Sequence, residues 1–312
     1  MRVCTLLLAG LFASSAAARA ERTVTLVAVG DMQLARGTQQ MIKREGVDYP
    51  FSGTAQTIRG ADLAVGNLEC ALSRDAKALV KRYSFKADPA SADGLARAGF
   101  DVLALANNHT LDCGRAGLLE TMAALDKRGL RWVGAGKDGK AAEEPLMLKR
   151  NGLRIAFLAR TAILPDGVVH RMDRPGAALL DAARTAEAVK SVSKRADVVV
   201  VLLHWGLEST YQPRETQRRI ARLLVDAGAD LIIGHHSHTP QAVERYHGAV
   251  IAYSLGNFIF DNPRERARHG LILQCVLTPS GVSSAQTIAV TIKQCRPEPV
   301  SSLKSDRSPA SR

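Results

Sequence analysis

Three histidines within four residues, His235, His236 and His238, are the clearest sign of chemistry in the sequence. They follow an apolar run at residues 229–233 that stops at Gly234. We therefore expect a buried strand that ends in a loop carrying imidazoles. Neutral imidazole is the commonest metal ligand in proteins, so the stretch indicates a metal site. A chance cluster of solvated histidines is the alternative.

Other polar side chains also stand where apolar runs end. In chain order they are Asp31, Asn67, Glu69, Asn108, His109, His204, His236 and His238. Carboxylate, amide and imidazole groups together suit a hard to borderline divalent metal. Residues i and i+2 of an extended segment point to the same side, so His236 and His238 can face one site while His235 points away.

The elements that must position these side chains alternate between strands and helices. Strands are expected at residues 23–29, 62–65, 101–106, 131–134, 197–203 and 229–233. Helices are expected at residues 37–44, 54–60, 90–98, 112–128, 179–195 and 213–227. Hairpins are expected at 146–159, where Asn151-Gly152 is a strong turn signal, and at 243–254, with a last strand pair at 270–277 and 284–292.

This alternation predicts an α/β protein with a mixed sheet, or two packed sheets flanked by helices. Open α/β sheets bind their ligands at the carboxyl ends of their strands, where the polar groups recur. The 312 residues suffice for one large core. We divide the chain into a signal peptide at 1–20, one domain at 21–295 and a disordered tail at 296–312 that is rich in proline, serine and charge.

The first twenty residues have the pattern of an export signal. Arg2 precedes a small, apolar run at residues 3–18, and Ala18-Arg19-Ala20 fits a cleavage site. We expect a periplasmic or secreted protein, with an uncleaved membrane anchor as the alternative. In an oxidising compartment the four remaining cysteines predict two disulfides. The favoured pairs are Cys70–Cys113 and Cys275–Cys295, and four buried free thiols are the alternative.

The charge balance bears on possible partners. The formal net charge is +12, and aromatic residues make up only 4% of the chain. Scarce aromatics argue against a surface that stacks nucleic-acid bases. The positive charge favours an acidic partner such as phosphate, polycarboxylate or anionic lipid, although a solvated basic face would look the same.

Six short motifs give the chain a family resemblance. They are Gly-Asp at 30–31, Gly-Asn-x-Glu at 66–69, Asn-Asn-His at 107–109, His-Trp-Gly at 204–206, Gly-x-His-x-His at 234–238 and Ser-Leu-Gly-Asn-Phe at 254–258. In this order and spacing they resemble the bacterial capsule synthesis protein CapA (poly-γ-glutamate biosynthesis) family, in the calcineurin-like metallophosphoesterase superfamily. The resemblance runs from about residue 23 to residue 261.

The resemblance implies a four-layer α/β/β/α sandwich with mixed sheets and a metal centre at the strand ends. It suggests Asp31, Asn108, His204, His236 and His238 as ligands of one or two divalent ions, among which Mn, Fe, Zn and Mg are candidates. It matches His109 to the superfamily's catalytic histidine. Independently of the family, a divalent metal lowers the pKa of its bound water to ~7, and a histidine beside it can act as general acid.

Two departures from the superfamily's pattern weaken this expectation. Gln33 stands where the first motif has a histidine, and Asn67 stands where the second has a bridging aspartate. Asn brings no charge, so Glu69 could take the bridging role, and the site could hold one metal. Glu208 is a second candidate catalytic group, or a solvated carboxylate. For substrate binding we single out Lys86, Asp112 and Asn257, whose alternatives are a surface lysine, a helix cap and a turn residue.

The function expected from these features is that of an exported metal-dependent hydrolase-like protein of the CapA type. It would act in the synthesis, release or attachment of an anionic cell-surface polymer, with poly-γ-glutamate as the candidate that the resemblance implies. Its partners would be that polymer or a phosphorylated substrate, with membrane-bound synthesis machinery as a further one and no nucleic acid. The alternatives are a general periplasmic metallophosphoesterase and a non-enzymatic accessory subunit of polymer export.

Overall fold

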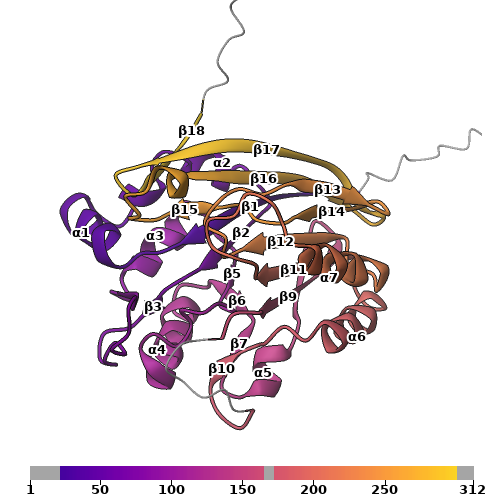
Figure 1. Cartoon of the computed structure of the whole chain (residues 1–312). Helices are drawn as coiled ribbons and strands as arrows, with labels where there is room; N and C mark the ends of the chain where they lie inside the picture. Colours follow the sequence, from indigo (N-terminus) through magenta and orange to yellow (C-terminus); the bar gives the residue numbers. More distant parts are fainter. Residues whose placement is uncertain (1–21, 165–171, 301–312) are drawn as a thin grey trace, which may run out of the picture.

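A computed structural model describes residues 22–164 and 172–300 of the chain (Figure 1). The expected signal peptide at 1–20, residues 301–312 of the expected tail, and residues 165–171 of an expected loop lie outside the described residues. In the part that is described, no helix is long and apolar enough to cross a membrane.

Two mixed sheets lie face to face in the middle of the molecule (Figure 1). Among the described residues the larger sheet has the order β18-β17-β16-β1-β2-β5-β6, and β15 pairs with the end of β1. Its strands are β1 (Val24–Met32), β2 (Leu63–Leu68), β5 (Val102–Ala104), β6 (Arg131–Val133), β15 (Asn257–Ile259), β16 (His269–Thr278), β17 (Gly281–Lys293) and β18 (Arg296–Pro299).

The second sheet has the order β13-β14-β12-β11-β9-β8. Its strands are β8 (Leu146–Arg150), β9 (Leu153–Thr161), β11 (Val198–His204), β12 (Leu231–His235), β13 (Val243–Tyr246) and β14 (Ala249–Ala252). In the second sheet the central strands are parallel, and the antiparallel strands β8 and β13 lie at its edges. In the larger sheet β1, β2, β5 and β6 run parallel, and β16, β17 and β18 extend the sheet on the other side of β1 by antiparallel pairing. Two short ribbons pair β3 (Ala71–Leu72) with β4 (Lys86–Ala87) and β7 (Ala135–Gly136) with β10 (Gly176–Ala177).

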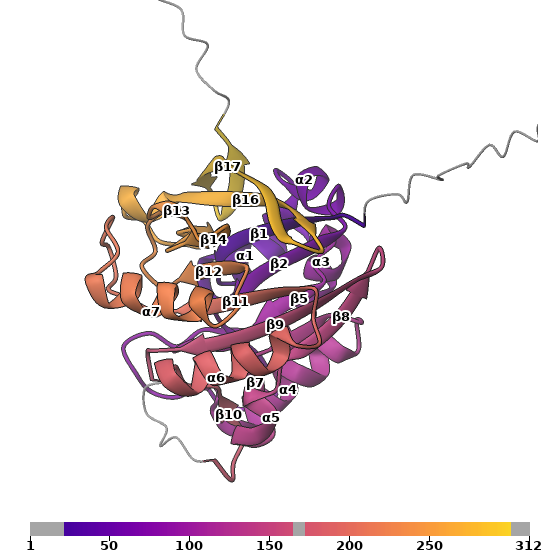
Figure 2. The same ribbon diagram turned by 90° about the vertical axis from the view of Figure 1, so that its right-hand side faces the viewer.

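Helices cover the outer faces of both sheets (Figure 2). On the larger sheet lie α1 (Arg36–Glu45), α2 (Ala55–Arg59), α3 (Ser91–Ala98) and α4 (Gly114–Asp126), with the 3-10 turn Tyr49–Phe51. On the smaller sheet lie α6 (Ala182–Ser193) and α7 (Glu215–Asp226). The short α5 (Gly139–Glu143) packs on β7, and a second 3-10 turn spans Glu265–Arg268.

The order of the layers follows from three separate apolar clusters. In β1, Leu26 packs between the two sheets, whereas Val27 packs under the helices of the larger sheet. In β11, Val200 packs between the sheets and Val201 packs against α6 and α7. Both faces of β11 are buried, which explains its unbroken apolar run. The structure is therefore the expected four-layer α/β/β/α sandwich.

The local predictions are largely confirmed. Asn151 and Gly152 both have positive φ, at 47° and 81°, as a type I′ hairpin turn between β8 and β9 requires. One boundary differs from the expectation: residues 296–299, assigned to the tail, form β18 and pair with β17. The long β17 offers an edge on which these residues can add a short strand.

The two predicted disulfides are wrong. Cys70, Cys113, Cys275 and Cys295 are all free thiols. Cys275 lies opposite Ala285 in the β16–β17 pair. Ala285 is ten residues before Cys295, and a strand rises ~3.3 Å per residue, so the two thiols are about 30 Å apart, too far for a disulfide. Burial raises the pKa of Cys70 to about 12 and that of Cys113 to about 11, which keeps both as neutral thiols.

Candidate metal centre

The polar side chains meet at the carboxyl ends of the parallel strands of both sheets. Asp31 lies near the end of β1 and pairs in register with Asn67 of β2 on one side and Asn257 of β15 on the other. From the second sheet, β11 ends at His204, and His236 follows the last residue of β12. Two packed sheets thus deliver their ligand candidates to one edge.

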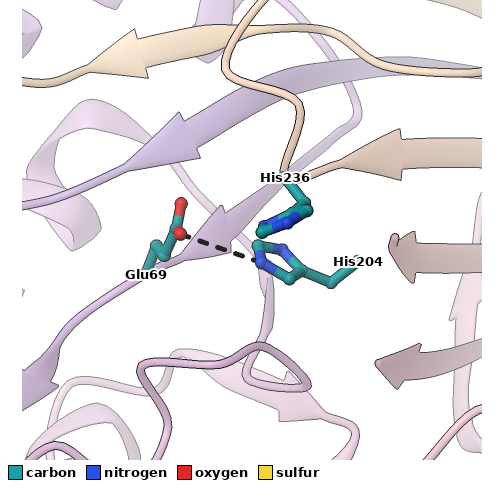
Figure 3. A group of neighbouring side chains, drawn as sticks. All are labelled: Glu69, His204 and His236. Carbon is teal, nitrogen blue, oxygen red and sulfur yellow. Dashed lines mark ion pairs between the residues drawn. The ribbon is translucent and has the colours of Figure 1, made fainter. Parts of the chain in front are cut away.

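Glu69 lies at the centre of this group and is fully buried (Figure 3). Its Oε1 is 3.7 Å from Nε2 of His204, 3.8 Å from Nε2 of His109 and 3.9 Å from Nε2 of His238. Neither carboxylate oxygen has a hydrogen-bond partner among the described residues. Burial, followed by the charge of Asp31, raises the pKa of Glu69 well above its ordinary value.

The imidazole of His204 is held by two amides. Its Nε2 lies 2.8 Å from Oδ1 of Asn108, and its Nδ1 lies 3.3 Å from Nδ2 of Asn67. Burial and the neighbouring His236 lower the pKa of His204 well below its ordinary value. Burial and His238 likewise lower the pKa of His236 to about 4. Both rings are therefore neutral at physiological pH, as metal ligation requires.

Asp31 and His238 form an ionic pair on the other side of Glu69. His238 Nδ1 lies 3.3 Å from Oδ2 of Asp31 and 2.9 Å from Oδ1 of Asn257. Burial opposes the charge of His238, but the charge of Glu69 and the bond to Asp31 raise its pKa to about 10. Burial also opposes the charge of Asp31, yet His238 and the nearby imidazoles lower the pKa of that carboxyl well below its usual range.

The loop after β12 places His236 and His238 by an unexpected geometry. Their φ angles are 90° and 55°, so the segment is not extended, and the i, i+2 argument for their common direction was wrong. Their ring centroids are 6.0 Å apart and both rings still face the cluster. As expected, His235 points elsewhere, with Nε2 3.3 Å from the carbonyl of Val29.

His109 stands beside the cluster in a chain of three side chains. Its Nδ1 is 2.7 Å from Oδ2 of Asp112, and Oδ1 of Asp112 is 2.6 Å from Nζ of Lys81. The ring stacks on Phe85 at 4.1 Å between centroids. Asp112 is therefore no helix cap: α4 begins after Cys113 without a side-chain cap, and the Asp112 carboxylate fixes the tautomer and orientation of His109.

A pocket of about 270 Å³ opens onto this edge. Its walls include His109, His238 and Glu208, so the pocket leads to the cluster. The remaining lining residues are Arg36, Tyr83, Phe85, Phe260, Asp261, Asn262, Pro263 and Arg264. Glu208 is exposed at the pocket wall and has a carboxylate oxygen within 4.8 Å of nitrogens of His236 and His238.

Two other residues singled out from the sequence lie outside the cluster. Lys86 donates from Nζ to the carbonyls of Arg74 and Ala76, at 2.9 and 2.7 Å, and does not line the pocket. It braces a loop, because the β4 strand turns its side chain toward residues 74–76. The amide of Gln33 accepts a hydrogen bond from Thr38 at 3.3 Å and belongs to no group of candidate ligands among the described residues.

Sequence reasoning missed three residues that build the site. Asn107 donates to Oδ1 of Asn67 and accepts from the backbone of His109, so it ties two of the polar stretches together. Its place in the Asn-Asn-His motif was a signal that could have found it. Lys81 reaches the site from a loop, and Arg36 reaches the pocket from the first residue of α1, and no local pattern marks either residue.

The donor set fits a divalent metal. In each of three groups of residues, the potential ligand atoms lie within 4.8 Å of one another. The groups are Glu69–His204–His236, Asp31–Glu69–His238 and Glu208–His236–His238. Besides the two oxygens of Glu69, Nδ1 of His236 is buried without a hydrogen-bond partner in the described part of the chain. Buried polar atoms are normally paired, and a cation would satisfy all three.

Comparison with known proteins decides the family. The family model described as bacterial capsule synthesis protein PGA_cap matches residues 25–262. The chain belongs to this family. Among curated proteins, the chain is 32% identical to the capsule biosynthesis protein CapA of Bacillus anthracis, over 91% of this chain and 71% of that protein. It is 33% identical to the PGA biosynthesis protein CapA of Bacillus subtilis, over 87% of this chain and 72% of that one.

Solved structures show that this PGA_cap protein has the metallophosphoesterase fold. A 5'-nucleotidase precursor from Thermus thermophilus superposes with a TM-score of 0.51 at 16% identity, covering 88% of this chain. The sulfate thiohydrolase SoxB from the same organism gives a TM-score of 0.51 at 14% identity, again over 88%. The chain spans about 56% of the length of either structure, and these likenesses concern the fold alone.

Proposed function

We propose that this CapA-type protein is an exported, metal-dependent hydrolase that acts on an anionic cell-surface polymer during its synthesis, release or attachment. The observation that carries the proposal is Glu69, a buried carboxylate with no hydrogen-bond partner among the described residues and three imidazoles within 4 Å. Without a cation such a group is costly to the fold, because a buried polar group needs a partner. The names of the two CapA relatives, which refer to capsule and PGA biosynthesis, support a polymer as the substrate.

Five residues would hold the metal: Asp31, Glu69, His204, His236 and His238. Asn257 would orient His238 through the hydrogen bond it already makes to Nδ1. Asn67 and Asn108 contact both ring nitrogens of His204, so the metal would replace one of these two contacts and the other would orient the ring. Imidazoles in this number favour Zn, Fe or Mn over Mg. Glu69, His236 and His238 each belong to two of the three ligand groups, so the groups can serve one ion or two close ions.

The metal would supply a polarised substrate bond and a water of lowered pKa. The chain's own part is to move and hold a proton. His109 presents Nε2 to the cluster while Asp112 holds Nδ1, so a proton on Nε2 can pass to the leaving group. Lys81 holds the Asp112 carboxylate in place through its contact with Oδ1. Phe85 covers one face of the His109 ring and excludes water from it.

The chemistry is tested with metal-loaded protein and poly-γ-glutamate, with chain length followed by size-exclusion chromatography. Asp112→Asn should lower kcat by roughly 10²–10⁴-fold while KM and metal content stay unchanged, because the His109 tautomer is lost and the ligands are kept. Asp75→Asn, a change of an exposed carboxylate that removes the same charge, is the matched control.

Two outcomes would contradict the proposal in different ways. Cleavage of aryl phosphate esters that depends on His109, with no change in polymer length, would favour a general metallophosphoesterase. Polymer binding that survives His236→Ala with His238→Ala, without any hydrolysis, would favour a non-enzymatic accessory role. Export is tested separately: the amino-terminal sequence of the protein recovered from the cell envelope should start at Glu21.

A further inference from the structure

Arg36 stands in the wall of the pocket that leads to the metal centre, and the machinery described above does not use it. Together with Arg264 it shares this pocket with His109 and His238. Arg36 has a φ of 53°, in the left-handed region that side-chain-bearing residues rarely adopt. Such strain persists where the surrounding structure holds a residue in place, and it is concentrated at functional sites.

Three neighbours fix the guanidinium of Arg36. Its Nε lies 3.2 Å from Oδ2 of Asp261, and its central carbon lies 5.5 Å from the ring centroid of Phe85 and 5.9 Å from that of Tyr83. Asp261 is itself anchored, since the same oxygen accepts the backbone N–H of Gly37 at 2.9 Å. A Cβ at Gly37 would lie 3.0 Å from the Cβ of Asp261, so glycine permits this close approach.

The terminal nitrogens of Arg36 remain available to a ligand. The ion pair with Asp261 is made through Nε, and neither Nη1 nor Nη2 donates a hydrogen bond to any residue that the structure describes. The side chain of Arg264, exposed in the same wall, likewise makes no ion pair within residues 22–164 and 172–300. A guanidinium fixed through Nε, with both Nη groups free, can bind two oxygens of a carboxylate or phosphate at once.

We propose that Arg36 binds a carboxylate of the substrate beside the metal centre and so selects a polyanion with regularly spaced carboxylates. The inference rests on the proposed function for the identity of the substrate. The aromatic walls of Tyr83, Phe85 and Phe260 would pack against the methylene groups between the carboxylates. Arg264 would contribute long-range attraction from the rim of the pocket.

A thermodynamic cycle tests the pairing of Arg36 with a carboxylate. The ligands are a γ-linked glutamate trimer and the same trimer with its α-carboxylates converted to amides. Binding is measured by titration calorimetry on metal-loaded protein carrying His109→Ala, which prevents turnover. Arg36→Gln should weaken binding of the carboxylate trimer by about tenfold or more, and should change binding of the amide trimer by less than twofold.

Three further variants complete the design. Arg44→Gln removes the same charge from an exposed position of the same helix, and should leave both affinities within twofold. Arg36→Lys should recover only part of the loss, because lysine cannot donate in a fork. Arg36→Gly removes the guanidinium and relieves the backbone strain, so it supplies a folded variant should Arg36→Gln fail to fold.

The results separate this inference from the function it rests on. Equal weakening of the carboxylate and amide trimers, or a loss no larger than that of Arg44→Gln, would overturn the role of Arg36. The role of Arg36 would also be overturned if Arg36→Gln weakened the binding of inorganic phosphate but not the binding of the carboxylate trimer. Metal content is measured on every variant: a protein that binds the trimer through Arg36 but takes up no metal would sink the proposed hydrolase and leave the carboxylate site standing.

Discussion

At the scale of single residues, Glu69 explains why Asn67 can occupy the position of a bridging aspartate. Nδ2 of Asn67 donates a hydrogen bond of 2.8 Å to Oδ1 of Asp31. Asn67 is neutral, and it holds the charged Asp31 carboxylate in position. In the proposed metal site, the negative charge that Asn67 lacks would be supplied two residues later by Glu69. The sequence allowed Glu69 to be proposed for this role, but its central position among the imidazoles required the structure.

Replacing Glu69 shows separately how its carboxylate affects folding stability and how it affects metal affinity. We expect Glu69→Gln to bind metal at least tenfold more weakly, because the charged ligand is gone. In chelator, the same variant should be no less stable than the parent at pH 7–8. The folded-state pKa of Glu69 is raised, so ionisation at these pH values costs stability, a cost that glutamine avoids.

Metal content by plasma mass spectrometry and urea unfolding in chelator measure the two effects. Glu208→Gln, a change at the exposed pocket wall, is the control and should leave stability unchanged. A chelated Glu69→Gln protein that unfolds in much less urea than the parent would show that Glu69 holds the fold by itself.

Metal uptake should release a proton. Without a cation, the pair of His238 and Glu69 retains a proton at neutral pH, since the pKa of His238 is raised to about 10 and that of Glu69 is raised as well. A metal replaces that proton, so apparent metal affinity should increase with pH up to about pH 10, by roughly tenfold per pH unit for one proton.

Calorimetric titration of the same metal in buffers of different ionisation enthalpy counts the released protons directly. About one proton per metal is expected. Heats that are identical in all buffers would mean that His238 and Glu69 are already deprotonated before binding.

The pair of His238 and Glu69 also makes the folding stability of the metal-free protein depend on pH. Both folded-state pKa values lie above the unfolded ones, so the folded state binds more protons at neutral pH. The contribution of this pair to folding stability is therefore greatest below the unfolded pKa of each group, and it decreases as pH rises toward the folded-state pKa of about 10 for His238. Bound metal should remove this dependence.

At the scale of elements, the sequence predicted what local patterns govern and missed what distant contacts govern. The strand β11 and the Asn151-Gly152 hairpin follow from apolar periodicity and turn chemistry. The positive φ angles at His236 and His238 do not, because the packing around that loop imposes them. Lys81 contacts Asp112 from a loop across the site, and no spacing in the sequence encodes such a pair.

The cysteine prediction failed for a related reason. An even cysteine number in a chain with an export signal favours disulfides, but only three-dimensional distances decide which thiols can meet. Cys275 and Cys295 lie far apart along the antiparallel ribbon of β16 and β17. Cys70 and Cys275 instead contribute to the apolar clusters, as buried free cysteines commonly do.

Gly234 shows how closely β12 must approach its surroundings to deliver the histidines. A Cβ there would lie 1.9 Å from the carbonyl oxygen of Tyr253 and 2.8 Å from Nε1 of Trp205. We expect Gly234→Ala to lower the free energy of unfolding by about 3 kcal/mol or more and to weaken metal binding, since the backbone of β12 must shift.

The control is Ala252→Gly in the neighbouring strand β14, which removes a methyl group without creating a clash. It should cost about 1–2 kcal/mol and leave metal affinity intact. Chemical unfolding and metal titration of both variants check the prediction. A Gly234→Ala protein with normal metal affinity would show that the loop carrying His236 tolerates movement of its strand.

At the scale of the whole molecule, the fold continues beyond the family match, which ends at residue 262. The last strands β16, β17 and β18 complete the larger sheet on the free side of β1. Their apolar side chains enter two cores: Leu273 and Leu277 pack between the sheets, and Ile272 and Val290 pack under the helices.

A chain that ends at residue 262 should therefore fail to fold, although it contains every candidate metal ligand. Loss of β16 uncovers one edge of β1 and the apolar residues that face it. Circular dichroism and size-exclusion chromatography should show an unfolded or aggregated product. A chain that ends at residue 300 retains β16, β17 and β18 and should fold, which makes it the control. A soluble, metal-binding 1–262 chain would restrict the functional unit to the matched region.

The positions of the candidate ligands along the chain determine at which stage of synthesis or export the site can form. Asp31 belongs to the first strand, whereas His236, His238 and Asn257 come near the end. A chain that emerges from the ribosome or from a translocation channel with its amino terminus first presents Asp31 early, without its imidazole partners. The proposed metal could be captured only after the segment with His236 and His238 has emerged, so the ion available in the compartment where the last strands fold would be the one that is bound.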